Sequence, residues 1–413
     1  MPLTKMQREY LANCDRRWNI KIGATGSGKS YLDIAATIPK RLLAARGEGL
    51  LVLMGNTRGT LERNILDPMR ELWGRNVAAR IGGDNTLRMF GRKVYVLGAD
   101  NQKHVARIQG ATIEYAYGDE IPTWSQGVFE MLKSRLRCEH SHFDGTGNPD
   151  NPQHWFKAFL ESGADIYQQS YTIDDNPKLP QRFVEELKRE YAGTVYYDRY
   201  ILGKWVAASG VIYRPFTDHP DSCYIDAEWL GAHPIRQATI GVDFGGNGSA
   251  NAFTCTGYTA GLRELVTLAE YYRKGTISPK QLDADFVAFA RDCLTRFGAR
   301  VAYCDSAEQT LMAGLRMACL SAGIPIAIEN ARKGVVNDRI RFLCRMIAAG
   351  RYRILRDCTH TADALSAAVW DGKHPTEDKR LDDGTTNIDS LDALEYSFEP
   401  FMNAMLYGVL FQG

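Results

Sequence analysis

One short stretch, residues 23–30, constrains the fold more than any other part of the sequence. It reads GATGSGKS and fits the pattern G-x-x-x-x-G-K-[ST] at every constrained position. Apolar residues precede it and residues 31–43 have a helical pattern, so it lies between a strand and a helix. In such a loop the glycines turn backbone N–H groups toward phosphate, the lysine reaches the outer phosphates, and the last hydroxyl can bind Mg²⁺. The predicted contacts of a nucleoside triphosphate, with Ser30 also a ligand of Mg²⁺, are Gly23, Ala24, Thr25, Gly26, Ser27, Gly28, Lys29 and Ser30.

A glutamine precedes this loop, within the segment LTKMQREY at residues 3–10. Many nucleic-acid-dependent ATPases place a glutamine at such a position, where it recognises the adenine edge. We therefore predict that Gln7 contacts the nucleotide base. A residue on a surface helix explains the same pattern equally well, and the sequence leaves both interpretations open.

A pair of acidic residues follows downstream at the end of a strand. Apolar residues 49–54 predict a buried strand, and strands and helices then alternate, which favours a parallel sheet with its ligand at the carboxyl ends of the strands. Residues 112–118 predict a further strand that leads to Asp119 and Glu120. We expect Asp119 to bind Mg²⁺ through water, and Glu120 to orient and deprotonate the attacking water. The alternative is an acidic loop end, and Glu114 with two tyrosines makes this strand less apolar than usual.

The turn at residues 146–149, Thr-Gly-Asn-Pro, comes after this strand. Such a turn is suited to sensing the γ-phosphate and passing the change to another part of the protein. Its residues are common turn formers, however, so an ordinary Asn-Pro turn is the simpler interpretation of this segment alone.

The C-terminal half places aspartates at the ends of strands. Residues 237–243 form a β-branched, apolar strand that ends at Asp243, followed by a Gly-rich turn and a second strand. After a long helix, residues 300–304 predict another strand that leads to Asp305. Antiparallel strands joined to a β-α-β layer in this order indicate a ribonuclease H-like fold.

A late helix supplies further carboxylates. Asp389 and Asp392 are three residues apart, so they share one helical face. With Asp243 and Asp305 they form a predicted cluster of negative charges, which repel one another unless divalent cations neutralise them. Two Mg²⁺ or Mn²⁺ ions about 4 Å apart can activate water and stabilise the leaving 3′ oxygen of a cleaved phosphodiester. Glu270, at the end of the third strand, is a weaker additional candidate, because a half-buried strand end explains it equally well.

Together these motifs resemble those of the large terminase subunit of tailed double-stranded DNA bacteriophages. The resemblance covers about residues 5–400. The matching segments are GATGSGKS, RIQG at 107–110, GDE at 118–120, TGNP at 146–149, QHW at 153–155, Asp174 with Asn176-Pro177, YILGKW at 200–205 and GVIY at 210–213.

The resemblance implies a P-loop ATPase domain that pumps double-stranded DNA into a preformed capsid, and a nuclease domain that cuts the DNA concatemer. In this family the late helix has a similar D-A-L-x-Y signature, so Asp392 is implied as one metal ligand and Asp389 as another. The implied catalytic residues are therefore Lys29, Glu120, Asp243, Asp305 and Asp392. An arginine, often from a neighbouring subunit, stabilises charge on the γ-phosphate, and Arg58 and Arg107 are the candidates here.

The resemblance also implies cofactors and partners. The cofactors are ATP with Mg²⁺ at the first site, and Mg²⁺ or Mn²⁺ at the second. The partners are double-stranded DNA bound without sequence specificity, the portal protein and procapsid, a small terminase subunit, and identical subunits in a ring, with no membrane. The implied location is the host cell cytoplasm during virion assembly.

Both halves are expected to be α/β domains. The predicted order is a P-loop ATPase domain at residues 1–208, with helices on both faces of a parallel sheet, a linker at 209–234, and a ribonuclease H-like nuclease domain at 235–400. A tail at 401–413 ends in GVLFQG, which resembles the recognition site of a protease used to remove tags, and has no part in the functional argument.

Charge and cysteine content restrict the alternatives. Lysine and arginine total 50 and aspartate and glutamate 49, so DNA contacts must come from local patches. One basic segment, residues 332–356, is expected to be mostly a solvated helix face; the alternative for its residues near the acidic cluster is that they hold DNA phosphates without reading sequence. The nine scattered cysteines form no C-x-x-C pair and predict free thiols in a reducing compartment. We expect no signal peptide, and no apolar run approaches the ~18 residues that a membrane span needs.

Two other functions fit part of the sequence. An ATP-dependent helicase or repair nuclease shares the phosphate loop and the acidic strand end, but residues beyond 235 lack arginine-bearing helicase motifs. Alternatively, the C-terminal half is a non-catalytic interaction platform. Loss of metal-dependent DNA cutting on removal of one aspartate would exclude that second alternative.

Overall fold

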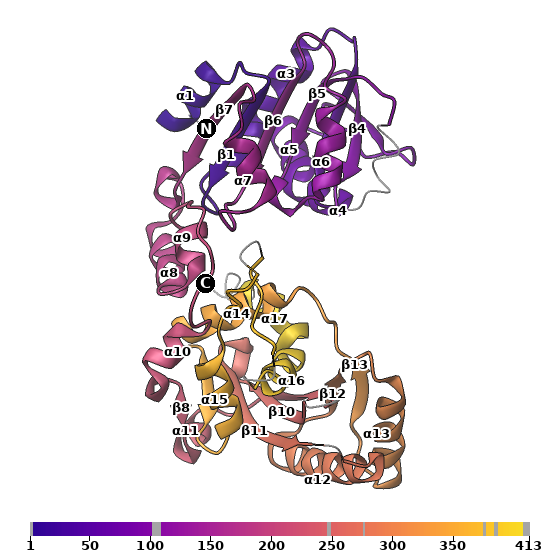
Figure 1. The fold of residues 1–413 in the computed structure, drawn as a ribbon, viewed down its shortest axis with the longest axis vertical. Coiled ribbons are helices and arrows are strands. Elements are labelled where there is room, and N and C mark those ends of the chain that lie inside the picture. Colours follow the sequence, from indigo (N-terminus) through magenta and orange to yellow (C-terminus); the bar gives the residue numbers. More distant parts are fainter. Residues whose placement is uncertain are drawn as a thin grey trace. The chain divides into compact units, whose positions relative to one another are not determined.

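The chain forms two compact units. The computed structural model describes residues 3–100, 109–245, 249–275, 277–374, 377–383 and 387–407. Unit 1 contains Met1–Glu185 and Val195–Ala207, and unit 2 contains Glu186–Thr194 and Ala208–Gly413. Figure 1 shows that each unit is a sheet packed against helices.

Unit 1 is built on a seven-stranded sheet with the order β3-β4-β2-β5-β6-β1-β7. Neighbouring strands are parallel except β3 and β4, which make an antiparallel edge. The predicted P-loop type of α/β fold is confirmed, although the edge strand β3 was not predicted. The strands are β1 (Trp18–Gly23), β2 (Leu50–Gly55), β3 (Thr86–Met89), β4 (Arg92–Gly98), β5 (Ile113–Gly118), β6 (His142–Gly147) and β7 (Ile166–Tyr171).

Helices cover both faces of this sheet (Figure 1). Successive side chains of a strand point to opposite faces, and both sets are apolar in β2. Val52 belongs to one core with Phe129 of α6 (Gln126–Lys133), whereas Leu53 belongs to the other core with Leu42 of α3 (Ile38–Ala44). The helices of unit 1 are α1 (Lys5–Asn13), α2 (Lys29–Leu32), α3 (Ile38–Ala44), α4 (Arg58–Leu61), α5 (Asp67–Trp73), α6 (Gln126–Lys133), α7 (Trp155–Leu160) and α9 (Val195–Tyr200). A further helix, α8 (Gln181–Tyr191), is divided between the units, because its residues from Glu186 onward group with unit 2.

A buried ion pair joins β1 to the helical segment that follows the phosphate loop. Lys21 Nζ lies 2.8 Å from Asp33 Oδ1, and both side chains are fully buried. The ammonium also lies over the ring of Tyr10, 3.8 Å from its centroid. Burial raises the pKa of Asp33 to about 6, and the positive charge of Lys21 opposes this rise. Removal of one partner from such a buried pair leaves the other charge uncompensated, which strongly destabilises the fold.

The raised pKa of Asp33 predicts a pH dependence of stability. The unfolded-state pKa is about 3.9 and the folded-state pKa about 6, so the folded chain binds more protons between these values. The contribution of Asp33 to the free energy of unfolding is therefore largest below pH 4 and falls by roughly 1–3 kcal/mol as the pH rises to 6. The measurement is urea unfolding at pH 4, 5, 6 and 7 for the wild type and Asp33→Asn. The stability difference between the two proteins should decline over this interval, and a flat difference would contradict the assignment.

Unit 2 contains a second seven-stranded sheet, with the order β13-β12-β9-β10-β11-β14-β8. The three central strands β9, β10 and β11 are antiparallel, and the outer strands pair in parallel. The strands are β8 (Tyr224–Ile225), β9 (Gln237–Asp243), β10 (Ala250–Tyr258), β11 (Leu265–Lys274), β12 (Val301–Cys304), β13 (Ala327–Asn330) and β14 (Tyr352–Leu355). The helices are α10 (Arg214–Asp218), α11 (Ala227–Ala232), α12 (Pro279–Phe297), α13 (Gln309–Ser321), α14 (Val336–Ala348), α15 (Thr359–Ala367), α16 (Asp389–Phe398) and α17 (Met402–Tyr407).

The late helix α16 packs directly on the central strands of unit 2. A Cβ at Gly241 of β9 would overlap the backbone carbonyl of Ala393, so only glycine allows this close approach. Thr239 Oγ1 and Tyr258 Oη donate to Ser397 O, at 2.9 and 3.0 Å. These contacts fix the helix over β9 and β10.

The chain between the two predicted domains is folded. Residues 209–234, predicted as a linker, contain α10, α11 and the strand β8, which pairs with β14 at the sheet edge. These residues therefore form part of unit 2, because the apolar side chains of Phe216 and Ile225 are buried there. Glu186–Thr194, within the predicted ATPase domain, also groups with unit 2. The functional boundaries themselves stay a prediction.

Two sequence expectations concern thiols and membranes. All nine cysteines are free, and eight of them are buried. This confirms the predicted free thiols.

Over the ranges that the structure describes, no helix combines the length and the apolar character that crossing a bilayer requires.

Candidate nucleotide and metal sites

The phosphate loop begins where β1 ends. A Cβ at Gly23 would overlap the backbone of Tyr171 on the neighbouring strand β7, so only glycine fits there. Gly26 and Gly28 have φ angles of 71° and 86°, in the left-handed region that glycine adopts at low cost. The N–H of Ala24 donates to Tyr171 O at 2.8 Å. The loop is therefore held against β7 by the sheet itself, and its glycines allow the turn that directs backbone N–H groups toward phosphate.

Lys29 starts α2 and is held by oxygen atoms of the loop and of a neighbouring turn. Its Nζ donates to Gly23 O at 2.9 Å, Ala24 O at 2.6 Å, Ser27 Oγ at 3.3 Å and Asn148 Oδ1 at 3.3 Å. Burial lowers the pKa of Lys29 to about 8, and the negative charges of Glu120 and Asp119 oppose this change. The side chain is thus mainly protonated at pH 7, as a phosphate-binding lysine must be.

Gln7 lies against the phosphate loop and not on the protein surface. Only 4% of the residue is exposed, and its Nε2 donates to Gly28 O at 3.1 Å. Gln7 also forms a capping box with Thr4 at the start of α1, which fixes the direction of its side chain. The alternative of a surface helix residue is therefore wrong, whereas recognition of adenine stays a prediction.

Asp119 lies immediately after β5, buried beside the loop. Its Oδ1 accepts a hydrogen bond from Thr146 Oγ1 at 3.2 Å, and its Oδ2 accepts one from Asn64 Nδ2 at 3.4 Å. Burial and the negative charge of Glu120 raise the pKa of Asp119 to about 6. A nearby cation favours the ionised form of such a carboxylate. The chemistry of this residue therefore fits its predicted role near Mg²⁺.

Glu120 and the turn at residues 146–149 are in contact. Glu120 has a φ angle of 51°, which is uncommon for a residue with a side chain. Asn148 Nδ2 donates to Glu120 Oε2 at 3.4 Å, while Asn148 Oδ1 accepts from Lys29. One amide thus joins the lysine and the glutamate on which the predicted chemistry depends. Sequence reasoning singled out this turn but did not predict the bridge, which no local pattern indicates.

The remaining predicted residues of unit 1 have less specific surroundings. Ser30 is half-buried in the first turn of α2, and its role as a Mg²⁺ ligand stays a prediction. Arg58, at the start of α4, is exposed, and its Nη1 donates to Asn85 Oδ1 at 2.9 Å. Arg107 lies outside the described residues.

The predicted metal ligands of unit 2 come from three elements. Asp243 ends β9, and Asp305 follows the adjacent strand β12, where its N–H donates to Val242 O at 3.0 Å. Asp389 and Asp392 lie in the first turn of α16, which packs on β9. Burial and the charges of the other three aspartates raise the pKa of Asp243 well above its usual range. The fold thus brings the four predicted carboxylates into one electrostatic group.

Cations and backbone groups contact three of these carboxylates. Lys333 Nζ lies 2.6 Å from Asp305 Oδ1, and Arg380 pairs with Asp392. The N–H of Ala250 donates to Asp389 Oδ2 at 2.9 Å. Among the described residues, no three His, Cys, Asp or Glu side chains are arranged as a ready-made metal site. The oxygen donors suit Mg²⁺ or Mn²⁺, so metal binding stays a prediction that requires some rearrangement of these contacts.

A buried glutamate, Glu395, forms ion pairs next to the four aspartates and was not predicted from the sequence. Glu395 on α16 is fully buried and pairs with Arg380 at 2.7 Å and with Arg339 at 3.2 Å. Tyr213 Oη donates to Glu395 Oε1 at 3.2 Å. The expectation of a solvated face is therefore wrong for Arg339, because only 4% of it is exposed. Arg380 in turn links Glu395 to Asp392.

Glu270 has a structural role in the described residues. Strand β11 continues past it to Lys274, so it does not end the strand as predicted. Its carboxylate accepts hydrogen bonds from the N–H groups of His360 and Thr361, both at 2.8 Å, and from Thr361 Oγ1. These are contacts with the first turn of α15, whose N–H groups lack partners within the helix. Glu270 therefore caps a helix.

Comparisons with known proteins agree with this architecture. The family model described as terminase large subunit, T4likevirus-type, N-terminal, matches residues 22–217. No curated protein sequence matches the chain. Among solved structures, the large terminase of a thermophilic bacteriophage has a TM-score of 0.82 and 24% identity, covering 98% of this chain and 100% of that chain. Its complexes with ADP and with ATP-γ-S have the same coverage, TM-scores of 0.79 and 0.78, and identities of 23% and 24%. At this level of identity the solved structures show the fold.

Proposed function

We propose that the chain is a member of the large terminase family of tailed bacteriophages, because the family model matches residues 22–217, and that it is a DNA-packaging ATPase that also cuts the DNA it packages. The ATPase site is assigned to unit 1 and the nuclease site to unit 2. The observation that supports the first assignment best is the bridge formed by Asn148 between Lys29 and Glu120. It joins the phosphate-binding loop to the residue that would activate water.

The phosphate loop fits a nucleoside triphosphate. Gly26 and Gly28 have left-handed φ angles, a Cβ at Gly23 would overlap the backbone of Tyr171, and Lys29 is buried and mainly protonated at pH 7. The complexes of the thermophilic phage terminase with ADP and ATP-γ-S support this ligand class. Ser30 and Asp119 would hold Mg²⁺, which neutralises charge on the β- and γ-phosphates.

Glu120 would orient the attacking water and take its proton. Hydrolysis removes the γ-phosphate that Lys29 binds, and Asn148 contacts Lys29 directly. The turn at residues 146–149 would then respond to the loss of the phosphate, in the role of a γ-phosphate sensor. Movement of a DNA-gripping surface would follow from that response.

In unit 2, Asp243, Asp305, Asp389 and Asp392 would hold two divalent cations, Mg²⁺ or Mn²⁺. Such ions activate water and stabilise the leaving oxygen of a phosphodiester. Arg380 pairs with both Asp392 and Glu395, so Glu395 would help to position the arginine that contacts this proposed metal ligand. The proposed nuclease would make the cuts in concatemeric DNA that start and end packaging.

The proposed role defines partners and a location. The chain would act as a ring of identical subunits on the portal of the procapsid, with a small terminase subunit that recruits double-stranded DNA. The DNA would be gripped without sequence recognition, in the host cell cytoplasm during virion assembly. Of the two candidates for an arginine that acts on the γ-phosphate, Arg58 and Arg107, Arg58 lies within the described residues, where it is exposed on α4. It would act within its own subunit or in a neighbouring one.

A DNase-protection assay tests the packaging proposal. Purified chain, procapsids with their portal, DNA and ATP should yield full-length DNA that resists DNase. Lys29→Ala should abolish protection, because the variant lacks the cation that binds the outer phosphates. Lys93→Met is the matched control, since this lysine of β4 is 59% exposed and its pair with Asp84 is 3.6 Å long. Protection by the Lys29→Ala protein would contradict the proposal.

A further inference from the structure

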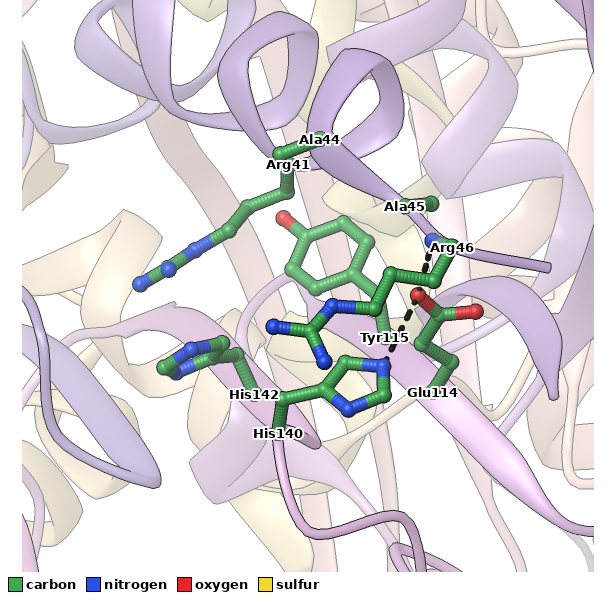
Figure 2. A pocket seen from close by; sticks show the side chains of 8 residues that line it. All are labelled: Arg41, Ala44, Ala45, Arg46, Glu114, Tyr115, His140 and His142. Atoms are coloured by element: carbon green, nitrogen blue, oxygen red, sulfur yellow. Dashed lines mark hydrogen bonds and ion pairs between the residues drawn. The ribbon is translucent and has the colours of Figure 1, made fainter. Parts of the chain in front are cut away.

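A cavity of about 160 Å³ lies near the beginnings of β5 and β6 in unit 1 (Figure 2). Tyr115 lines it, four residues before Asp119, which corresponds to roughly 13 Å along an extended strand. The cavity is therefore distinct from the proposed ATPase site. It has room for about five water molecules at ~30 Å³ each. Its strand residues, Glu114 and Tyr115, are among those that made this strand unusual in the sequence.

Nitrogen-bearing side chains from three elements line this cavity. Figure 2 shows Arg41 of α3, Arg46 of the following loop, and His142 of β6 around the ring of Tyr115. Arg41 Nε pairs with Asp144 at 2.9 Å and its Nη2 donates to Cys14 O at 2.6 Å, which leaves Nη1 as a donor.

Arg46 differs from Arg41 because, within the described residues, no acidic side chain forms an ion pair with its guanidinium. Its guanidinium has no hydrogen bond or ion pair within the described part of the chain, and the residue is exposed at the rim of the cavity. Lys and Arg groups that are neither paired nor buried are available to an incoming anion. Arg46 is thus the natural anchor for a negatively charged ligand.

Tyr115 adds a buried donor. Only 2% of the residue is exposed, and its hydroxyl makes no hydrogen bond of ordinary geometry in the structure described. Burial and the nearby charge of Asp144 raise the pKa of Tyr115 well above its usual range, so the hydroxyl keeps its proton. The nearest acceptor is the Asp144 carboxylate, which Arg41 already pairs with, and a buried hydroxyl that lacks a well-formed hydrogen bond is costly, so a ligand oxygen would satisfy it.

The one acidic side chain in the lining is already engaged. Glu114 accepts hydrogen bonds from the N–H groups of Arg46, Gly47 at 2.9 Å and Glu48 at 3.0 Å, and from His140 Nε2 at 3.2 Å. These bonds fix the loop that contains Arg46. The carboxylate of Glu48 lies 3.8 Å from His140 Nδ1 but is 58% exposed, so solvent screens it from an anion in the cavity.

We propose that this cavity binds a phosphate group, with Arg46 as the charged anchor and Arg41 Nη1 and the Tyr115 hydroxyl as further donors. Arginine forks match the geometry of phosphate oxygens, and a hydroxyl donor completes a mixed site of this kind. The group is either free phosphate or a phosphate of the DNA backbone. In both cases the chemistry that recognises it is the same.

The test uses the full chain with Lys29→Ala, which disables the phosphate loop as a competing site. Inorganic phosphate is titrated by calorimetry, and a 30-base-pair duplex is titrated by fluorescence anisotropy at several salt concentrations. Each titration is repeated with Arg46→Gln or Tyr115→Phe added. Arg88→Gln is the matched control, because Arg88 is an exposed arginine on β3 outside the cavity.

For the ligand that occupies the cavity, phosphate or duplex DNA, Arg46→Gln should raise the Kd by about tenfold or more and Tyr115→Phe by about two- to tenfold. Arg88→Gln should change that Kd less than about twofold. Sensitivity of phosphate binding to these substitutions would identify free phosphate as the ligand. Sensitivity of DNA binding alone, with a smaller salt dependence in Arg46→Gln, would identify the DNA backbone. If neither titration responds to Arg46→Gln and Tyr115→Phe, the proposal is overturned.

Discussion

Replacing Glu120 by Gln is expected to lower ATP turnover by about 10³-fold and to leave the Kd for nucleotide within about threefold. The amide has the size of the carboxylate and can keep the contact with Asn148, but it cannot take a proton from water. Because Lys29 and the loop glycines are unchanged, phosphate binding should persist. Steady-state phosphate release measures turnover, and displacement of a fluorescent nucleotide measures affinity.

The control for this substitution is Glu130→Gln on α6. Glu130 is 51% exposed and pairs with Lys133 on the same helix, so its loss should change turnover less than about twofold. A Glu120→Gln protein that still turns over ATP at the wild-type rate would show that another group activates water. Such a result would require a new assignment of the ATPase chemistry.

The sequence predicted the parts of the ATPase site that depend on local pattern. The phosphate loop is such a part, because its glycines and Lys29 are adjacent in the chain and their roles follow from residue type. Asp119 and Glu120 were also identifiable, since an acidic pair at a strand end is a local feature. The bridge through Asn148 was not, because Asn148 and Lys29 are 119 residues apart and only the sheet brings them together. The assigned roles remain predictions that the substitutions above test.

In unit 2 the aspartates at the strand ends and the late helix were predicted from the sequence, but the ion pairs around the aspartates were not. Glu395 lies inside the same helical signature as Asp392, yet nothing in the sequence pairs it with Arg380 or with Arg339, 56 residues before it. Ion pairs at such separations have no periodicity that a sequence pattern could reveal. The strand β8 was missed for a similar reason, since two residues are too short to show alternation.

The cations around the acidic group affect how its carboxylates behave. Like charges that converge on one site destabilise each other unless cations neutralise them. In the described residues Lys333 contacts Asp305, and the backbone N–H groups of Lys333 and Gly334 bind the carboxylate of Glu399 at 3.0 and 2.6 Å. Glu399 thereby fixes the segment from which Lys333 reaches Asp305. The contact is 38% exposed on the lysine side, so it can open without unfolding the core.

Replacing Asp305 by Ala is expected to reduce metal-dependent cleavage of supercoiled plasmid by at least about 10²-fold. Removal of one carboxylate takes away a ligand of the divalent cations that the proposed nuclease requires. The fold should persist, because Asp305 follows β12 and its backbone N–H bond to Val242 does not depend on the side chain. The assay compares the wild type and the variant with Mn²⁺, with Mg²⁺ and with EDTA, by separating nicked and linear products on a gel.

The matched control is Asp221→Ala, since Asp221 is 89% exposed and lies 3.9 Å from its partner Arg356, away from the acidic group. This protein should cut like the wild type, and neither should cut in EDTA. Cleavage by the Asp305→Ala protein at the wild-type rate would place the metal site elsewhere. If the wild type fails to cut with either metal at millimolar concentration while ATP turnover is normal, the acidic group is not a nuclease in the isolated chain. The C-terminal unit would then fit the interaction platform, in which Lys333 and Arg380 serve to neutralise the aspartates permanently.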